Sequence, residues 1–378
     1  MSAAAWTQPD VIVIGGGIQG CSTALNLAMR GVKALLIEKD HAGRHASGVN
    51  AGGVRRLGRH IAEIPLSVVS MEIWHRIEAL VDDDCGFESH GQIKVAETTA
   101  ELDVQRARVA QVKQLGFEHE EIIEQAELRA LVPAIAPHCV GAIICRTDGA
   151  ALPFRTVQAM KLKAEGLGAR FIEGVCVNDV KRAGDVWRVE TDSGPHEAPT
   201  IINCAGAWAD RIAAKLGEPV PLEVIAPMLM ITARMPRFVH PVIGAQGRTL
   251  SFKQYDNGTV LIGGGYRGRP NRDTNRTELD FAKLAENAQT AAALFPIMAQ
   301  ALIMRAWAGI EARMPDDIPV IGPSSTSPGV FHAFGFSAHG FQLGPAVGQV
   351  LAELVTTGRS NIPIDGLSIA RFANAETN

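Results

Sequence analysis

Three glycines near the start of the chain have the spacing of a nucleotide-binding turn. Gly15, Gly17 and Gly20 form G-x-G-x-x-G directly after the β-branched run at residues 11–14. Bare glycines let the backbone approach a phosphate closely, and the free N–H groups at a helix start attract an anion. Glu38, at the end of the next apolar run, can accept hydrogen bonds from a ribose. These residues predict a site for the pyrophosphate and ribose of a dinucleotide.

The elements that must position this turn are predicted by the residues around it. The runs at 11–14 and 34–37 are short and apolar, which is typical of buried parallel strands. Between them, small and apolar residues recur at helical spacing until Gly31. Strand, turn, helix, strand and acid together make the pattern specific, whereas G-x-G-x-x-G alone is weak. A tight turn beside a surface glutamate is the alternative, and the pattern does not separate NAD from FAD.

Composition narrows the class of protein. A chain of 378 residues is long enough for about two domains, and 47% hydrophobic against 20% charged residues excludes a mainly disordered chain. The net charge is −4 and no basic stripe is present, so we expect no nucleic acid partner. Glycine is abundant, with 38 residues, many in short runs, which favours a large bound cofactor.

Cysteine usage and hydropathy predict a cytoplasmic protein without a metal centre. The six cysteines show no C-x-x-C spacing, so we expect neither a disulfide framework nor a zinc site. The start of the chain lacks the pattern of a signal peptide. No apolar run approaches the roughly 20 residues of a membrane span.

Four further segments carry small residues beside charged or aromatic ones: 44–55, 201–208, 307–322 and 334–345. In order and spacing, over nearly the whole chain, they resemble the D-amino-acid oxidase, glycine oxidase and sarcosine oxidase superfamily of FAD-dependent amine oxidoreductases. The resemblance implies an α/β fold, α+β overall, with a discontinuous Rossmann-like FAD-binding domain and a second, antiparallel-sheet substrate domain. The FAD-binding pieces would be 1–85, 145–220 and 305–378, and the substrate-domain pieces 86–144 and 221–304. Strands are predicted at 91–96, 223–234 and 259–264, and a helix at 279–294.

The resemblance also implies which residues contact FAD. Val177 is equally compatible with an ordinary strand valine, and no cysteine follows Cys204 that could bind the flavin covalently. We therefore expect non-covalent FAD. The implied contacts are Gly15, Gly17, Gly20, Glu38, Lys39, Ala46, Ser47, Ala51, Gly52, Gly53, Val177, Ala205, Gly206, Ser337, His339, Gly340, Phe341 and Gln342.

The implied reaction is oxidation of a C–N bond in a small amino, imino or N-substituted amino acid. Hydride would pass to flavin N5, and the imine product would be hydrolysed. A helix predicted to begin near Pro345 would point its N-terminus at the reduced flavin and stabilise its charge. Flavin carries the chemistry, so no strong protein base is required. His339 and Glu311 are the candidate catalytic side chains, although His339 fits a positioning role better, as does His45 in its loop.

The substrate pocket departs from the best-known members. Where relatives of this kind bind the substrate carboxylate with arginine, tyrosine or lysine, this chain has Glu311, Ser251 and Gln342. Replacement anchors are Arg55, Arg56 and Arg313, each of which could instead be a structural arginine. Glu311 could face a cationic group of the substrate or cap a structural pair. No lysine occurs between Lys253 and Lys283, which favours a dehydrogenase over an oxidase.

The sequence of residues 307–311 resembles that of the flavoprotein β subunits of bacterial multi-subunit amino acid and opine dehydrogenases. Partner subunits or an electron acceptor protein are therefore kept as a hypothesis. Two alternatives stay open: an FAD-bearing subunit with little activity alone, and another FAD enzyme such as a flavin hydroxylase. The hydroxylase would need a nicotinamide site, and no second G-x-G-x-x-G follows a strand.

Overall fold

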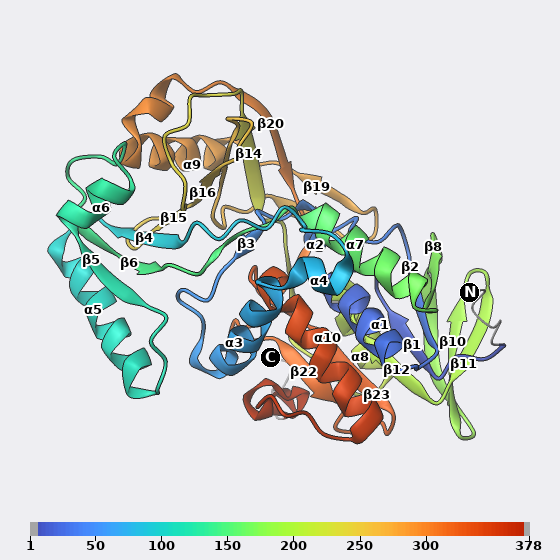
Figure 1. The fold of residues 1–378 in the computed structure, drawn as a ribbon. Helices are drawn as coiled ribbons and strands as arrows, with labels where there is room; N and C mark the ends of the chain where they lie inside the picture. Colours follow the sequence, from blue (N-terminus) through green and yellow to red (C-terminus); the bar gives the residue numbers. More distant parts are fainter. Residues whose placement is uncertain (1–6, 374–378) are drawn as a thin grey trace.

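A six-stranded sheet forms the half with the glycine turn in the computed structural model, which describes residues 7–373 (Figure 1). Its strands lie in the order β22-β23-β12-β1-β2-β8, and all neighbours are parallel except β22 and β23. The strands are β1 (Val11–Ile14), β2 (Ala34–Glu38), β8 (Arg170–Glu173), β12 (Thr200–Asn203), β22 (Val320–Pro323) and β23 (Val330–Phe334). The predicted strands on both sides of the glycine turn are thus confirmed.

The central strand β1 faces a different core on each side of the sheet. Val11 and Val13 pack against the helix layer, whereas Ile12 and Ile14 pack against a three-stranded meander. All four are buried because both faces of a parallel sheet are covered. The helix layer consists of α1 (Ile18–Met29), α3 (Ile64–Trp74), α4 (Ile77–Val81), α7 (Pro153–Gly166) and α10 (Gly340–Thr357), and the meander of β9 (Val177–Ala183), β10 (Val186–Thr191) and β11 (Gly194–Ala198).

An eight-stranded sheet forms the other half, at the upper left of Figure 1. It is antiparallel apart from the parallel pair β15–β4, and α9 buries Leu284 and Leu294 in its core. In order, the strands are β20 (Ile303–Ala308), β14 (Met228–Thr232), β17 (Val260–Gly263), β16 (Ser251–Gln254), β15 (Val242–Ala245), β4 (Gln92–Ala96), β6 (Gly141–Cys145) and β5 (Glu121–Glu124). Its helices are α5 (Thr99–Gln114), α6 (Gln125–Leu131) and α9 (Phe281–Leu294).

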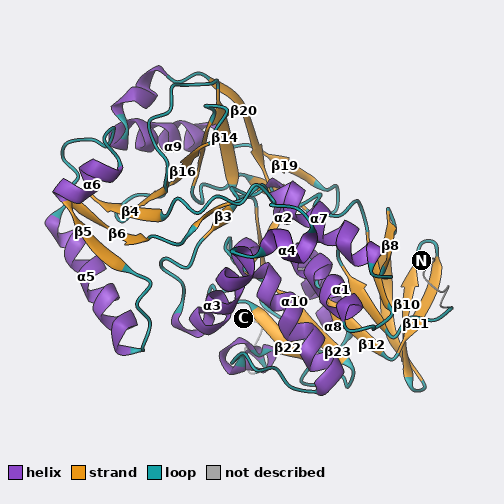
Figure 2. Ribbon diagram, in the orientation of Figure 1, coloured by secondary structure: helices purple, strands orange, loops and turns teal. Residues whose placement is uncertain are grey.

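Short elements connect the two halves (Figure 2). Three two-stranded ribbons pair β3 (Gly53–Val54) with β7 (Gly149–Ala150), β13 (Glu223–Ile225) with β21 (Glu311–Arg313), and β18 (Arg269–Asn271) with β19 (Arg276–Glu278). The remaining helices are α2 (Ala46–Val49), α8 (Ala209–Lys215) and 3₁₀ turns at Ile61–Glu63, Gly206–Trp208, Pro296–Gln300, Asp365–Leu367 and Ile369–Phe372.

In the half with the eight-stranded sheet, β4, β17 and α9 confirm three of the predicted elements. The predicted strand at 223–234 is divided into β13 and β14, with Pro227 between them, a residue that cannot donate to a strand ladder. The predicted domain boundary at 304/305 falls inside β20, whose residues pair with β14 as one strand. Among residues 7–373, no helix is both long and apolar enough to cross a membrane.

The predicted start of the last helix near Pro345 is wrong. Helix α10 begins at Gly340, so Pro345 lies inside it. The proline is tolerated because side chains of other helices satisfy the backbone around it. Ser70 Oγ and Trp74 Nε1 donate to the carbonyl oxygen of Gln342, and Ser22 Oγ donates to that of Pro345.

Candidate active site

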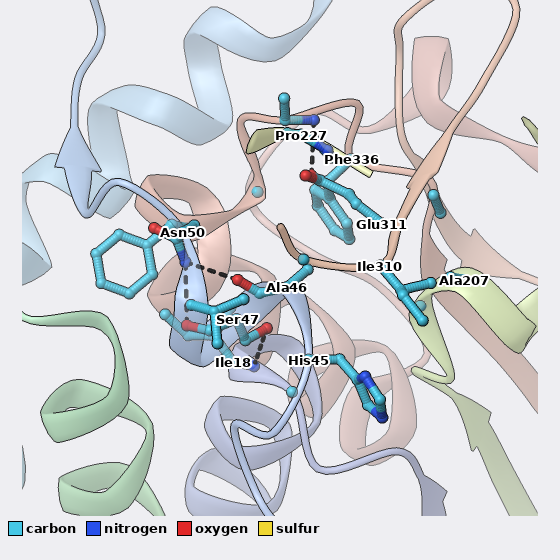
Figure 3. Close-up of a pocket in the computed structure, with 18 of the residues that line it drawn as sticks. Ile18, His45, Ala46, Ser47, Asn50, Ala207, Pro227, Ile310, Glu311 and Phe336 are labelled. Carbon is cyan, nitrogen blue, oxygen red and sulfur yellow. Dashed lines mark hydrogen bonds between the residues drawn. The ribbon is translucent and has the colours of Figure 1, made fainter. Parts of the chain in front are cut away.

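A cavity of about 580 Å³ runs between the two halves. At one end it is lined by the turn between β1 and α1, and at the other by β4, β15 and β16 of the eight-stranded sheet. The start of α10 and the segment Gly309–Ala312 line it between these ends. The close-up in Figure 3 shows the loop around α2 and the Glu311 segment facing this space.

The three motif glycines have different roles at the first end. Gly15 has φ +108°, and a Cβ there would lie 2.4 Å from the carbonyl oxygen of Cys204. A Cβ on Gly20 would lie 1.9 Å from the carbonyl oxygen of Gly15, so Gly20 allows α1 to pack against its own turn. Gly17 is the N-cap residue and has no side chain that could cap the helix. Apart from the N–H of Ile18, which donates to Ser47 Oγ, the first N–H groups of α1 have no side-chain partner among residues 7–373 and are available to an anion.

The loop around α2 is fixed against this helix start. Ser47 Oγ accepts a hydrogen bond of 3.0 Å from the N–H of Ile18. Asn50 organises the loop itself, because its Nδ2 donates to the carbonyls of Ala46 and Ser47 and its Oδ1 accepts from the N–H of Gly52. Figure 3 shows the two bonds that Asn50 Nδ2 donates; the sequence pattern had not indicated a role for Asn50.

Glu38 lies at the end of β2 with its side chain buried. Its Oε2 accepts from the N–H of Gly16 at 2.6 Å, and its Oε1 accepts from the N–H of Asp40 at 2.8 Å. Burial raises the pKa of this carboxyl, although the two N–H groups oppose the shift. Each oxygen retains a second lone pair, so Glu38 can hold the turn and still accept from a ribose.

Aromatic and charged side chains gather beside Glu38. Lys39 Nζ lies 3.8 Å from the ring centre of Trp208, and the His45 ring lies 4.7 Å from the same ring. His45 Nε2 is 2.8 Å from Asp40 Oδ2. Burial and the nearby Lys39 lower the pKa of His45 to about 4, so its imidazole is neutral at pH 7. Figure 3 shows His45 well apart from Glu311, which favours a positioning role.

The ribbon β18–β19 lies between elements of the eight-stranded half in the sequence, but it contacts the end of the cavity near Glu38. Asn275, at its tip, contacts Lys39 and Asp40, and Trp208 Nε1 donates to the carbonyl of Arg272. Arg272 also forms a bidentate pair with Asp210 on α8, at 2.6 and 3.0 Å. This ribbon therefore ties the two halves together, a link that no local sequence pattern indicated.

At the start of α10 the backbone is unusual. Ser337 and Ala338 both have left-handed φ angles, of 50° and 70°, which is costly for residues other than glycine. Side chains hold this conformation: Ser337 Oγ accepts from the N–H of Met314, and Glu311 Oε1 accepts from that of Ala338 at 2.7 Å. His339 follows, and its Nδ1 lies 3.1 Å from Oε1 of the buried Glu63.

The pKa values of His339, Glu63 and Glu311 are shifted in different directions from their usual values. Burial lowers the pKa of His339 despite the nearby Glu63. Burial raises the pKa of Glu63, but His339 and Arg59 outweigh this and leave it below its usual value. Glu311 has no ion-pair partner among the described residues, and burial raises its pKa to about 7. Glu311 is therefore poised to exchange a proton near neutral pH.

Three cations line the cavity near the eight-stranded sheet: Arg55, Arg59 and Lys94. No carboxylate of residues 7–373 lies within 4.0 Å of their side-chain nitrogens. Arg59 is only 2% exposed and donates to Gln342 Oε1 at 3.1 Å, while its second terminal nitrogen has no partner among the described residues. Burial and Arg55 lower the pKa of Arg59 to about 9, and burial lowers those of Arg55 and Lys94.

The nearby acids hold backbone or other partners instead. Asp148 accepts from the N–H groups of Arg56 and Leu57, and Glu120 accepts from that of Gly58 and pairs with Arg108. These acids fix the loop that carries Arg55 and Arg59, and they act on both guanidinium groups only from beyond 4.0 Å.

Most of the predicted site residues line this cavity. They are Gly15, Gly17, Glu38, Lys39, Ala46, Ser47, Ala51, Gly53, Val177, Ala205, Gly206, His339, Gly340 and Phe341 among the cofactor candidates, and Arg55, Ser251 and Glu311 among the substrate candidates.

Six predicted residues do not line it. Gly20 packs against the carbonyl of Gly15, and Gly52 packs against that of Ala151. Ser337 faces Met314. Gln342 is buried between Arg59 and Ser67. Arg56 lies against Asp148 and Thr147, and Arg313 pairs with Glu223 and Asp317 beside a smaller neighbouring cavity. Sequence reasoning missed Arg59, Lys94 and Glu63, because arginine, lysine and glutamate are common on surfaces.

Comparison with known proteins defines the class. Residues 10–354 match the FAD dependent oxidoreductase (DAO) family model, and the chain belongs to this family. It is 26% identical to mouse mitochondrial sarcosine dehydrogenase over 97% of this chain, which spans only 42% of that protein. It is 25% identical to hydrogen cyanide synthase subunit HcnC of Pseudomonas aeruginosa, with 96% of each chain covered. The crystal structure of L-proline dehydrogenase from P. horikoshii superposes with a TM-score of 0.91 and 27% identity, covering 98% and 99% of the two chains.

FAD is the cofactor of this family, and the residues present fit it. The N–H groups at the start of α1 that Ser47 leaves free suit the pyrophosphate, and Glu38 suits the adenosine ribose. Gly340 and Phe341 line the same cavity, so the start of α10 is open to the flavin ring. Attachment without a covalent bond stays a prediction.

Proposed function

We propose that this chain oxidises the C–N bond of a small amino, imino or N-substituted amino acid. Bound FAD supplies the two-electron acceptor for hydride from the carbon beside the nitrogen. The observation that carries the proposal is that one cavity brings unpaired cations and Glu311 to the start of α10. A carboxylate fits Arg55, and an amine fits Glu311.

The protein groups have separate tasks in this proposal. Arg55 orients the substrate by its carboxylate, because a guanidinium binds a carboxylate through two parallel hydrogen bonds. Glu311 accepts a proton from the substrate ammonium, because only the neutral amine has the lone pair that assists hydride loss. The uncapped N–H groups at the start of α10 stabilise negative charge that develops nearby. His339 and Glu63 position the loop that begins this helix.

The test is anaerobic reduction of the bound flavin by pools of amino acids, imino acids and N-carboxyalkyl amino acids. We expect one pool to bleach the visible absorbance, and division of that pool identifies the substrate. Readmission of oxygen then separates an oxidase, whose colour returns quickly, from a dehydrogenase. Flavin that dithionite reduces but no pool bleaches would contradict the proposal.

Glu311→Gln should remove a pH dependence. The pKa of Glu311 is about 7, so its carboxylate form increases as the pH rises through neutrality. We expect kcat/KM of the wild type to rise over this range, and the Gln variant to lose this rise while its amide oxygen still accepts from Ala338. The measurement is kcat/KM between about pH 5.5 and 8.5, around that pKa. If kcat/KM of the variant still rose with pH as in the wild type, the titration would belong to another group.

Assembly with partner subunits is a second proposal, favoured by the match to HcnC over nearly the full length of both chains. In that case the purified chain would bind FAD and be reduced by substrate, yet pass electrons slowly to small acceptors. A chain that sizes as a monomer and turns over at full rate with an artificial acceptor would exclude it.

A further inference from the structure

The cations in the cavity exceed what one substrate carboxylate requires. Arg55, Arg59 and Lys94 all line it, and none has a carboxylate of the described residues within 4.0 Å. Removing a cation from water without a counter-ion is unfavourable, so such groups are normally paired. One carboxylate bound at Arg55, as proposed above, leaves Lys94 unpaired.

The three cations come from two separate elements. Arg55 and Arg59 belong to one loop, in which Arg59 Nε donates to the carbonyl of Arg55 at 3.1 Å. Lys94 lies on β4 in the eight-stranded sheet, and Gln92, on the same face of that strand, also lines the cavity. Lys94 therefore approaches the ligand from the sheet, whereas the arginines approach it from the loop.

The other candidate counter-ions are already engaged. Glu63 lies against His339, Asp148 holds backbone N–H groups, and Glu120 pairs with Arg108. The pyrophosphate of FAD belongs at the start of α1, at the other end of the cavity. These carboxylates act on the three cations only over distances beyond 4.0 Å, so neither they nor the cofactor phosphates give Lys94 or Arg55 a directly contacting counter-ion.

We infer that the substrate is a dicarboxylic amine, with one carboxylate bound by Arg55, backed by Arg59, and a second bound by Lys94. This inference rests on the proposed function and names its substrate class. Secondary amines that carry a carboxylate on both N-substituents, and acidic amino acids, belong to this class. A second carboxylate gives Lys94 a counter-ion, which a monocarboxylic amine leaves unpaired.

The test uses two ligands that cannot be oxidised and differ by one carboxylate. Diglycolate and methoxyacetate are the ether counterparts of a dicarboxylic and a monocarboxylic amine. Each is titrated into the FAD-loaded protein, and binding is followed by the perturbation of the flavin spectrum. We expect diglycolate to bind about 10- to 100-fold more tightly, the range for a charge-assisted contact.

Variants then locate the second carboxylate. Lys94→Gln should reduce the preference for diglycolate about tenfold or more, while the affinity for methoxyacetate changes little. Lys94→Arg keeps the charge and should keep most of the preference. Lys181→Gln removes an exposed lysine of β9, paired with Glu190, and should change neither ligand.

Three results would overturn the inference. They are equal affinities in the wild type, equal weakening of both ligands by Lys94→Gln, and a diglycolate preference that survives this variant. The wild-type comparison requires no variant to fold. Failure here is distinct from failure of the proposed function, because flavin bleached by monocarboxylic amines alone would retain that function and reject the second carboxylate.

Discussion

Gly20→Ala is expected to yield a protein that purifies almost without flavin. The added Cβ would lie 1.9 Å from the carbonyl oxygen of Gly15, and neither group is a flexible side chain that could move away. Relief requires shifting the start of α1 away from the turn, and overpacking of this kind costs typically about 1–3 kcal/mol. A penalty near the middle of that range lowers the affinity for FAD about 30-fold. The measurement is the flavin-to-protein absorbance ratio of the purified protein, which should fall accordingly.

Gly166→Ala is the matched control for this variant. Gly166 is the last residue of α7, and a Cβ there would meet nothing within 4 Å. Alanine favours a helical backbone over glycine, so full flavin content and equal or slightly higher stability are expected. Normal flavin content in Gly20→Ala would show that the turn can open without losing the pyrophosphate site.

Arg55→Met should raise the KM for the substrate about 100-fold. A charged hydrogen bond contributes about 1.5–3 kcal/mol, and the methionine leaves the substrate carboxylate facing an apolar side chain. The effect should fall mainly on KM, because the carboxylate contact is present in both the ground state and the transition state. Steady-state kinetics with the substrate identified by flavin bleaching measures it.

Two further variants make this result specific. Arg55→Lys keeps the charge but loses the bidentate contact, so an intermediate KM is expected. Arg188→Met removes an arginine of β10 that pairs with Glu190 and Glu197 on the surface, and it should leave KM unchanged. If Arg55→Met reacted as the wild type does, the carboxylate would have to bind elsewhere in the cavity.

The half with the glycine turn could be predicted because its determinants are local. The turn at Gly15–Gly20 requires residues without a Cβ, and the apolar runs beside it require burial on both faces, so both leave direct marks in the sequence. Pro345 shows the limit of local reasoning. Its helix begins at Gly340, and the proline is tolerated inside it because Ser70 and Trp74, from a distant helix, satisfy the carbonyl of Gln342.

The part of the cavity near the eight-stranded sheet was harder to predict because distant residues line it. Arg59 contacts Gln342 across most of the chain, and this contact holds a cation at the cavity. No periodicity marks such a pair. Arg313, predicted as an anchor, instead pairs with Asp317 one helical turn's spacing away in the sequence. Such close acid partners could have identified it as a structural arginine.

The position of β1 between two cores has a thermodynamic consequence. Val11 and Val13 belong to one core and Ile12 and Ile14 to the other, and the strand ends at Gly15. Loosening either core therefore displaces the backbone that receives the pyrophosphate. Cofactor affinity and the free energy of unfolding become linked quantities, since a ligand bound only by the folded state stabilises it by mass action. At a free FAD concentration one hundred times its Kd, this linkage contributes about 2.7 kcal/mol.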